Sequence, residues 1–249
     1  MWDSVPFSHV KTDVHDREIA TMFDRIAARY DFLNRVLSFG TDIGWRRRAL
    51  ALAGIERGQA VLDVGAGTGD LSFAAAALGA RVVAVDLSPG MLAVLARRGG
   101  ADHADHAGHA GERSLIQALV GTAEALPVPD ACVDRIITGF TVRNVGDLPR
   151  ALAEFRRVLR PGGRTVILEL SHPPSATFAR LYSFYFDRVA PVVAGLLGGD
   201  REAYRYLPRS LRPFPDADRL AGLLRDAGFR NVAYQRLTLG IAAIHTGEA

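Results

Sequence analysis

The sequence predicts an α/β fold built around a doubly wound, mostly parallel sheet. Short apolar runs alternate along the chain with stretches whose apolar residues recur every three or four positions. The first run leads into a turn with glycines at 65, 67 and 69, and the next run, VVAVD, closes on Asp86. A glycine turn followed by an acid at the end of the next strand is typical of parallel sheets that bind an adenosine-containing cofactor at their carboxyl edge.

The N-terminal part is predicted to be a helical cap spanning residues 1–53. From about residue 16 onward, one apolar face recurs at helical spacing, formed by Ile19, Met22, Phe23, Ile26, Tyr30, Leu33 and Leu37. The sequence Ser38-Phe39-Gly40 interrupts this pattern, and Trp45 with three arginines opens a second helix. Residues 54–249 are expected to hold the sheet, so that the whole chain is one domain with appendages.

Seven strands are expected in that sheet, and helices separate most of them. The strands are predicted at 60–64, 81–86, near 115–120, 133–138, 164–170, near 232–237 and near 240–245. Helices are predicted at 71–78, 147–159 and 216–227, and the sequence Pro-Gly-Gly at 161–163 is predicted to turn the chain into the fifth strand. The last two strands are short and adjacent, which indicates a closing hairpin.

Two insertions interrupt this alternation. Residues 171–215, after the fifth strand, carry the aromatic side chains Phe178, Tyr182, Phe184, Tyr185, Phe186, Tyr204 and Tyr206. These side chains form either a lid or an extension of the core. Residues 99–113 are of low complexity and contain His103, His106 and His109. Their glycines argue against a helix and no second-shell pattern of acids fixes the rings, so we expect a solvated insertion and assign no metal ion.

Composition excludes several classes of protein. The chain has 249 residues and 49% hydrophobic content, and it contains no apolar run long enough to span a bilayer. Its start lacks an apolar signal core, and Cys132 is the single cysteine, so we expect a cytoplasmic protein without disulfides. A net charge of +3 is too mild to indicate nucleic-acid binding, although it is compatible with weak attraction to anionic lipid.

The spacing of the glycine turn indicates which cofactor it binds. The dinucleotide fingerprint is GxGxxG, whereas this turn reads GxGxG, with Asp70 in the place of the last glycine. A carboxylate there would repel a pyrophosphate but would attract the sulfonium and ammonium groups of S-adenosylmethionine. Asp63 places a second acid at the mouth of the turn. The sequence therefore predicts S-adenosylmethionine, and the alternative is a turn that packs without any ligand.

The chain resembles the ubiquinone/menaquinone-biosynthesis C-methyltransferases over nearly its whole length. Four blocks carry the resemblance: 29–47 (RYDFLNRVLSFGTDIGWRR), 61–72 (VLDVGAGTGDLS), 140–173 and 204–229. The second block is shared by many methyltransferases, and the other three are specific. The resemblance implies the Rossmann-like fold of the class I S-adenosylmethionine-dependent methyltransferases, with 54–249 as the methyltransferase domain. It also implies methylation of a ring carbon of a polyprenylated hydroquinone without a metal.

Carried over by position, the resemblance implies a cofactor site made of Asp63, Gly65, Gly67, Thr68, Gly69, Asp86, Thr122 and Ala123. Asp86 would hold the ribose, and Thr122 and Ala123 would contact the adenine edge. Many relatives carry Asn at position 122 and Ser at position 139, where this chain has Thr122 and Gly139. Two further departures are Asp42, where His is frequent, and His172, where Lys is common, so we do not assign His172 as a base.

For catalysis, the resemblance implies Arg143, Asn144, Tyr30 and Asp31. Arg143 would stabilise a phenolate, and Asn144 would position a water or a ring hydroxyl. Tyr30 and Asp31 would reach the ring from the cap. From the residues alone, Arg143 would be a surface ion pair, Tyr30 a core aromatic and Asp31 a solvated charge. With the resemblance we assign function to Arg143 and Tyr30 and leave Asp31 open.

Several alternatives stay open at this point. The absence of a mitochondrial-type presequence favours a menaquinone (vitamin K2) pathway over a ubiquinone pathway, and an enzyme serving both is a third option. A protein that binds the cofactor without catalysis, as a scaffold in quinone synthesis, is the alternative from another class. The resemblance also leaves open a homodimer, peripheral contact with the inner face of the membrane, the prenyl chain length and the identity of the general base.

Overall fold

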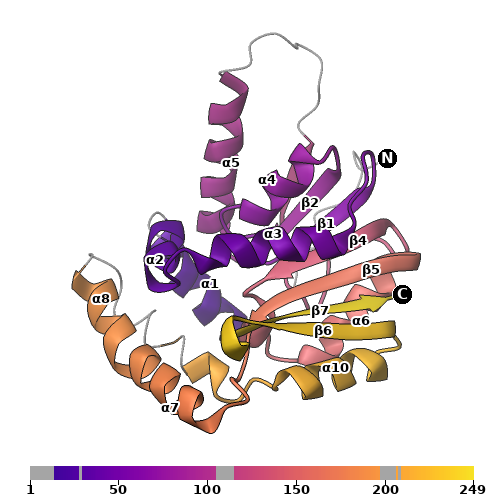
Figure 1. Ribbon diagram of the computed structural model, residues 1–249. Coiled ribbons are helices and arrows are strands. Elements are labelled where there is room, and N and C mark those ends of the chain that lie inside the picture. Colours follow the sequence, from indigo (N-terminus) through magenta and orange to yellow (C-terminus); the bar gives the residue numbers. More distant parts are fainter. Residues whose placement is uncertain (1–13, 28–29, 105–114, 197–205, 207–208) are drawn as a thin grey trace.

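Seven strands form one mixed sheet in the computed structural model of the protein, which describes residues 14–27, 30–104, 115–196, 206 and 209–249 (Figure 1). The strands are β1 (Ala60–Val64), β2 (Arg81–Asp86), β3 (Ile116–Val120), β4 (Val133–Gly139), β5 (Leu159–Leu170), β6 (Arg230–Leu237) and β7 (Ala242–Glu248). Their order across the sheet is β3-β2-β1-β4-β5-β7-β6. The first five strands pair in parallel, and β7 lies antiparallel between β5 and β6. The predicted doubly wound sheet with a closing hairpin is confirmed.

Helices cover both faces of the sheet, so its centre is the core. On one face lie α3 (Thr41–Ala53), α4 (Asp70–Ala77) and α5 (Pro89–Ala104), and on the other lie α6 (Leu148–Val158) and α10 (Ala217–Asp226). All five residues of β1 are buried. The starts of α6 and α10 follow from their N-caps, because the side chains of Asp147 and Asp216 accept backbone N–H bonds from Arg150 and Arg219.

The predicted helical cap consists of separate helices with different partners. Helix α1 (Val14–Ile26) packs on α5, and α2 (Tyr30–Leu37) packs on α3 and α8 (Ala190–Leu196). Helix α3 lies directly on β4 and β5. It begins after Gly40, whose φ of +73° allows the sharp turn that the sequence predicted at 38–40. The division of the chain at residue 53 stays a prediction.

Two predicted boundaries are wrong. Strand β5 begins at Leu159 instead of residue 164, and the predicted turn Pro161-Gly162-Gly163 is an irregularity inside it, where Gly162 has a φ of +78° and the pairing with β4 shifts register. Helix α5 continues through Gly99 and Gly100 to Ala104, although those glycines were taken as evidence against a helix. Each glycine costs a helix about 1 kcal/mol relative to alanine. The side chain of Arg98 offsets this cost because it anchors the preceding turn to Asp70 and Asp31. His106 and His109 lie outside the described residues.

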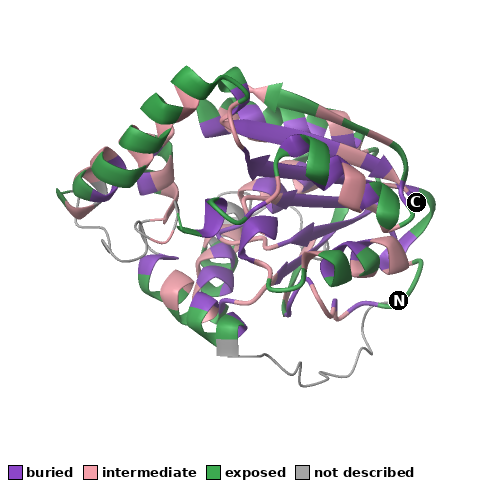
Figure 2. Ribbon diagram, turned by 90° about the horizontal axis from the view of Figure 1, so that it is seen from below, coloured by how far each residue is buried: buried purple, intermediate pink, exposed green. Residues whose placement is uncertain are grey.

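The insertion after β5 folds into an arm of helices, α7 (Ala176–Phe184), the π-helical turn η3 (Tyr185–Val189) and α8. The arm projects from the sheet beside α2 (Figure 1). None of the residues of α7 and η3 is buried, and the burial view shows the arm as a run of exposed and intermediate residues (Figure 2). Among the described residues, no helix is long and apolar enough to cross a membrane.

Candidate active site

The glycine turn between β1 and α4 forms the floor of the site. Gly65 has a φ of +69°, and a Cβ added to it would lie 2.1 Å from the Oγ1 of Thr141. Glycine is therefore required at position 65 both by the backbone conformation and by the closeness of Thr141. Gly67 has a φ of +55°, and a Cβ there would meet nothing within 4 Å. The second glycine thus faces open space, which is what a turn that cradles a ligand requires.

Asp86, at the carboxyl end of β2, holds this turn in shape. Its Oδ2 accepts a hydrogen bond from the Gly67 N–H and its Oδ1 accepts one from the Ser88 N–H, both at 2.8 Å. Burial raises the pKa of Asp86, and these two N–H donors oppose the rise. A carboxylate has further lone pairs beyond the two in use, so Asp86 can still accept hydrogen bonds from a pair of hydroxyls.

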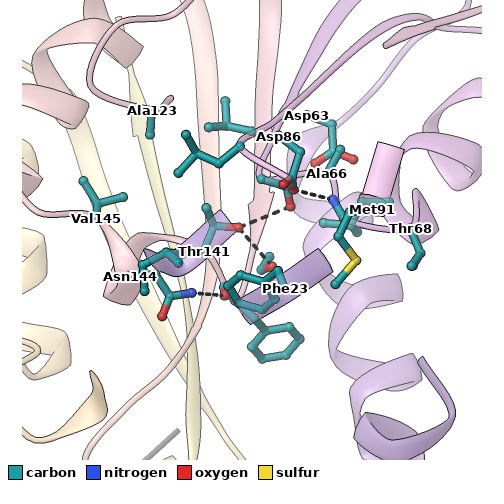
Figure 3. A pocket seen from close by; sticks show the side chains of 18 of the residues that line it. Phe23, Asp63, Ala66, Thr68, Asp86, Met91, Ala123, Thr141, Asn144 and Val145 are labelled. Atoms are coloured by element: carbon teal, nitrogen blue, oxygen red, sulfur yellow. Dashed lines mark hydrogen bonds between the residues drawn. The ribbon is translucent and has the colours of Figure 1, made fainter. Parts of the chain in front are cut away.

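A cavity opens above the turn and encloses about 870 Å³, part of it open to solvent. It is lined by every residue predicted to bind the cofactor except Gly69. Figure 3 shows Asp63 and Asp86 beside Ala66, with Ala123, Val145 and Asn144 on the side opposite to Thr68 and Met91. We call this space the cofactor cavity. Gly69 is needed next to it for packing, because a Cβ there would lie 2.9 Å from Leu95 and Phe73.

Four aspartates line the cofactor cavity, namely Asp16, Asp63, Asp70 and Asp86. Asp63 is buried, and its Oδ2 accepts a hydrogen bond from Ser72 at 2.6 Å, while its Oδ1 has no partner within the described residues. Burial raises the pKa of Asp63 to about 7. Asp70 pairs with Arg98 at 3.0 Å. A cationic ligand would complete the bonding of Asp63, whereas an anion would be repelled, so the residues present fit the sulfonium and ammonium groups of S-adenosylmethionine.

Helix α1 covers the cofactor cavity. Its side chains Ile19 and Phe23 line the cavity, and Phe23 packs edge-on against Tyr30 with ring centroids 5.9 Å apart. The Oδ1 of Asp24 accepts hydrogen bonds from the Ser88 hydroxyl at 2.5 Å and from the Gly90 N–H at 2.8 Å, at the start of α5. The apolar face that the helical spacing of this segment predicted therefore lies against the cofactor cavity.

A second cavity lies between α2, α3 and the arm. It encloses about 1240 Å³, including space open to solvent, and is lined mainly by apolar and aromatic side chains such as Trp45, Phe178, Tyr182, Tyr185 and Phe186. We call it the apolar cavity. The aromatic side chains of α7 and η3 thus line a cavity, as a lid would, while Tyr182 and Phe186 also pack against the main hydrophobic core.

Arg143 lines the apolar cavity and forms a buried ion pair. Its Nη1 donates to the Oε1 of Glu169 at 2.6 Å, and both side chains are 2% exposed. Glu169 also accepts backbone N–H bonds from Arg143 and Leu170. Burial alone would lower the pKa of the Arg143 guanidinium, but the pairing with Glu169 outweighs it and raises the pKa. Arg143 is therefore a permanent cation, and its Nε has no partner among the described atoms.

Tyr30, Arg46 and Phe140 line both cavities and mark where they meet. The guanidinium of Arg46 lies 5.1 Å from the centroid of the Phe140 ring, and its Nε makes no hydrogen bond within the described part of the chain. Burial raises the pKa of Tyr30, although Arg143 and Arg46 oppose the rise. Tyr30 thus keeps its proton at neutral pH and serves as a hydrogen-bond donor.

The four predicted catalytic residues do not all come together. Arg143 lines only the apolar cavity, whereas its neighbour Asn144 lines only the cofactor cavity, with its Oδ1 unpartnered within the described structure. Asp31 lines neither cavity, because its carboxylate accepts hydrogen bonds from Thr68 at 2.7 Å and Arg98 at 3.3 Å. Thr68 lines the cofactor cavity, but its hydroxyl points to Asp31.

Sequence reasoning missed three side chains of the site. Glu169 stands in the block 140–173 and was not considered as the partner of Arg143. Arg46 was noted only as one of three arginines that open a helix. Tyr182 was counted among the aromatics, yet its hydroxyl has no partner within the described residues and lies in the apolar cavity. Each of the three follows or interrupts an apolar pattern, which is the only signal that the sequence offered.

Comparison with known proteins places this site in context. Residues 11–249 match the ubiE/COQ5 methyltransferase family. The chain is 45% identical over 230 residues to the demethylmenaquinone methyltransferase of Thermus thermophilus, a match covering 91% of this chain and 99% of that protein. It is also 45% identical over 233 residues to the ubiquinone/menaquinone biosynthesis C-methyltransferase UbiE of Geobacter sulfurreducens, covering 92% and 88% of the two chains.

Solved structures share the fold at low sequence identity. An S-adenosylmethionine-dependent methyltransferase of Thermotoga maritima superposes with a TM-score of 0.65 at 19% identity, covering 92% of this chain and 99% of that one. Phosphoethanolamine N-methyltransferase 2 of Haemonchus contortus, solved with S-adenosyl-L-methionine, has a TM-score of 0.57 at 16% identity, covering 81% of this chain and 52% of that one. These likenesses confirm the predicted class I methyltransferase fold.

Proposed function

Because the chain belongs to the ubiE/COQ5 methyltransferase family, we propose that it uses S-adenosylmethionine to methylate a ring carbon of a polyprenylated hydroquinone, and that its substrate is demethylmenaquinol. The observation that carries this proposal is the meeting of two unlike cavities at Tyr30, Arg46 and Phe140. One is acidic and bounded by the glycine turn, and the other is apolar and bounded by aromatic rings. Such a pair suits a cationic cofactor beside a prenylated ring.

Residues at different strand ends of the cofactor cavity are assigned to different parts of the cofactor. We assign the ribose hydroxyls to Asp86, the adenine edge to Thr122 and Ala123, and the positively charged end to Asp63. Asn144 joins this group instead of the ring, because its free Oδ1 lies in the cofactor cavity. When bound, S-adenosylmethionine supplies an electrophilic methyl group. The residues around it fix its orientation, which is worth several kcal/mol in well-aligned reactions.

The apolar cavity offers the hydroquinone a few polar groups in a mainly apolar wall. The Nε of Arg143 and the hydroxyl of Tyr182 have no hydrogen-bond partner within the described residues, and the Nε of Arg46 makes no hydrogen bond there but lies 3.7 Å from Asp42 and 3.8 Å from Asp70. A ring carbon is a poor nucleophile until the neighbouring hydroxyl loses its proton. The two guanidinium groups would stabilise the resulting phenolate, because a positive charge in an apolar surrounding acts strongly on a developing anion. Tyr30 and Tyr182 would donate hydrogen bonds to ring oxygens, since burial raises the pKa of both phenols.

We propose menaquinone as the product; relatives that match nearly the full length include enzymes named for demethylmenaquinone and enzymes named for both ubiquinone and menaquinone, and both groups are consistent with it. A non-catalytic scaffold is less consistent with Arg143, whose buried charge is costly and faces the apolar cavity. One chain lines both cavities, so the proposal needs no second subunit. We place the enzyme in the cytoplasm at the inner face of the membrane, where a prenylated substrate resides.

A parallel assay of two substrates tests the proposal. The protein is incubated with S-adenosylmethionine labelled in the methyl group and with either demethylmenaquinol or the 2-methoxy-6-polyprenyl-1,4-benzoquinol of the ubiquinone pathway. We expect label in the organic phase with demethylmenaquinol at a much higher kcat/KM than with the benzoquinol. Equal rates would indicate an enzyme that serves both pathways. Absence of label with both, while the cofactor still binds, would support the scaffold and refute the proposal.

A further inference from the structure

Exposed hydrophobic side chains gather around the mouth of the apolar cavity. Ten large hydrophobic residues in the described structure are at least 44% exposed. Six of the ten lie on the arm or in the two turns beside that cavity, at 38–40 and 238–240, namely Phe39, Leu181, Phe184, Val192, Leu196 and Leu239. Single exposed hydrophobic residues are normal on a protein surface, but a concentration of them marks an interaction site. We call these six residues the apolar rim.

The apolar rim is continuous with the cavity that it surrounds. Phe39 and Leu181 are 79% and 64% exposed and also line the apolar cavity. Leu239 is 72% exposed and lies in the turn η4 (Thr238–Gly240), whose first residue lines the cavity as well. An apolar molecule leaving the cavity beside Phe39 and Leu181 would therefore meet the rim.

Two rim residues hold strained backbone conformations that keep their side chains outside. Phe39 has a φ of +52° and Leu239 a φ of +58°, a region that bulky residues rarely adopt. Neither side chain gains burial from this conformation, since both are among the most exposed hydrophobic residues described. Strained conformations of this kind cluster at functional sites. The ring of Phe39 lies 5.8 Å from the ring of Tyr185, which lines the apolar cavity.

The charges on the arm favour an anionic partner. Arg180 on α7 and Arg188 on η3 are exposed, and neither forms an ion pair within the described residues. The acid of the arm, Asp187, is already paired with Arg212 at 3.1 Å. Unpaired basic side chains beside exposed apolar ones are the combination that binds the surface of an anionic membrane.

We propose that the apolar rim, flanked by Arg180 and Arg188, docks the enzyme on an anionic phospholipid bilayer, so that a prenyl tail passes from the lipid into the apolar cavity. This inference rests on the proposed function, since a prenylated ring is what the cavity is assigned to hold. A bilayer explains why the rim lies at the cavity mouth, because the substrate tail enters there from the lipid. Binding of a partner protein would not require the binding surface to lie at that mouth.

Vesicle sedimentation with a matched pair of variants tests the docking face. The test variant carries Leu196→Ser and Leu239→Ser, and the control carries Leu78→Ser and Leu115→Ser, two exposed leucines away from the rim. With vesicles of phosphatidylcholine and phosphatidylglycerol, we expect the test variant to lose at least about tenfold in partitioning and the control to match the wild type. The wild type should bind more weakly to vesicles of phosphatidylcholine alone. A variant with Arg180→Gln and Arg188→Gln should bind the mixed vesicles more weakly than the wild type does.

Two further measurements separate this inference from the proposed function. Methylation of a short-chain hydroquinone in buffer should be the same in both leucine variants, while turnover of the prenylated substrate in vesicles should fall only in the test variant. Equal vesicle binding by the test variant and the wild type would overturn the docking face. So would a wild type that is dimeric in solution together with a test variant that is monomeric, because the rim would then be a dimer interface. If the wild type binds vesicles through the rim but methylates neither hydroquinone, the docking face stands and the proposed function fails.

Discussion

Removing the side chain of Arg143 should damage stability and catalysis through two separable effects. The stability effect comes from Glu169, which is left buried without its cation. Breaking a buried ion pair by removing one partner costs about 3–5 kcal/mol. Glu169 keeps the backbone N–H bonds from Arg143 and Leu170, so we expect Arg143→Met to cost about 3 kcal/mol of unfolding free energy, the low end of that range.

The catalytic effect comes from the phenolate. Losing an oxyanion-stabilising donor lowers the rate about 10²–10³-fold, which is roughly 3–4 kcal/mol in the transition state. The double variant Arg143→Met with Glu169→Gln carries no buried charge at this position. It should therefore recover most of the stability of the wild type while keeping the low rate. Glu169→Gln alone keeps the cation and should retain more activity than either variant that lacks Arg143.

Urea unfolding, calorimetric binding of S-adenosylmethionine and single-turnover methyl transfer on the same preparations separate these effects. Cofactor affinity should change little in all three variants, because Arg143 lines only the apolar cavity. A double variant as unstable as Arg143→Met would show that packing, not charge, links the two residues. A double variant with wild-type turnover would remove Arg143 from catalysis.

Three other perturbations test the cofactor cavity. Gly65→Ala should cost at least about 2 kcal/mol of unfolding free energy, because its Cβ would lie 2.1 Å from Thr141 at a positive φ. Gly67→Ala should cost about 1 kcal/mol and should weaken cofactor binding more than it weakens the fold. Similar urea midpoints for the two variants would contradict this. Burial raises the pKa of Asp63 to about 7 from an ordinary 3.8, so the folded ligand-free protein holds a proton that the unfolded chain releases. Its stability should therefore fall as the pH rises from about 4 to 7, cofactor affinity should fall as the pH drops below about 7, and Asp63→Asn should abolish both trends in melting and titration experiments. S-adenosylmethionine should raise the Tm and NAD should not, and Asp86→Ala should weaken cofactor binding by about 1–3 kcal/mol; an unchanged Kd would exclude Asp86 from the site.

The sheet could be predicted from the sequence because its strands carry local signals. Strands β1 and β2 are short, mostly apolar segments with sharp ends, and their predicted limits agree with the structure. The caps Asp147 and Asp216 likewise mark helix starts that any reader of the chain can find. Residues 161–163 show the limit of this reasoning, because the Pro-Gly-Gly sequence forms an irregularity inside β5, with Gly162 at a φ of +78°, and does not precede the strand.

The part of the site that lies at the carboxyl ends of single strands could be predicted from the sequence. The glycine turn follows β1, and Asp63 and Asp86 lie at the ends of β1 and β2, so their shared cavity follows from the topology. The pairing of Arg143 with Glu169 joins residues 26 positions apart, and no pattern in either segment indicates it. The division of Arg143 and Asn144 between two cavities depends on the 3₁₀ turn η2 (Val142–Asn144), whose tight geometry directs neighbouring side chains apart.

The position of the transferred methyl group tests the central claim most directly. Demethylmenaquinol is incubated with the protein and S-adenosylmethionine carrying a trideuterated methyl group, and the product is analysed by mass spectrometry and NMR. The account predicts a trideuteromethyl group on a ring carbon and the loss of one ring proton, in a product that oxidises to menaquinone. A methyl ether on a ring oxygen, or recovery of unchanged demethylmenaquinol from protein that binds the cofactor, would contradict it.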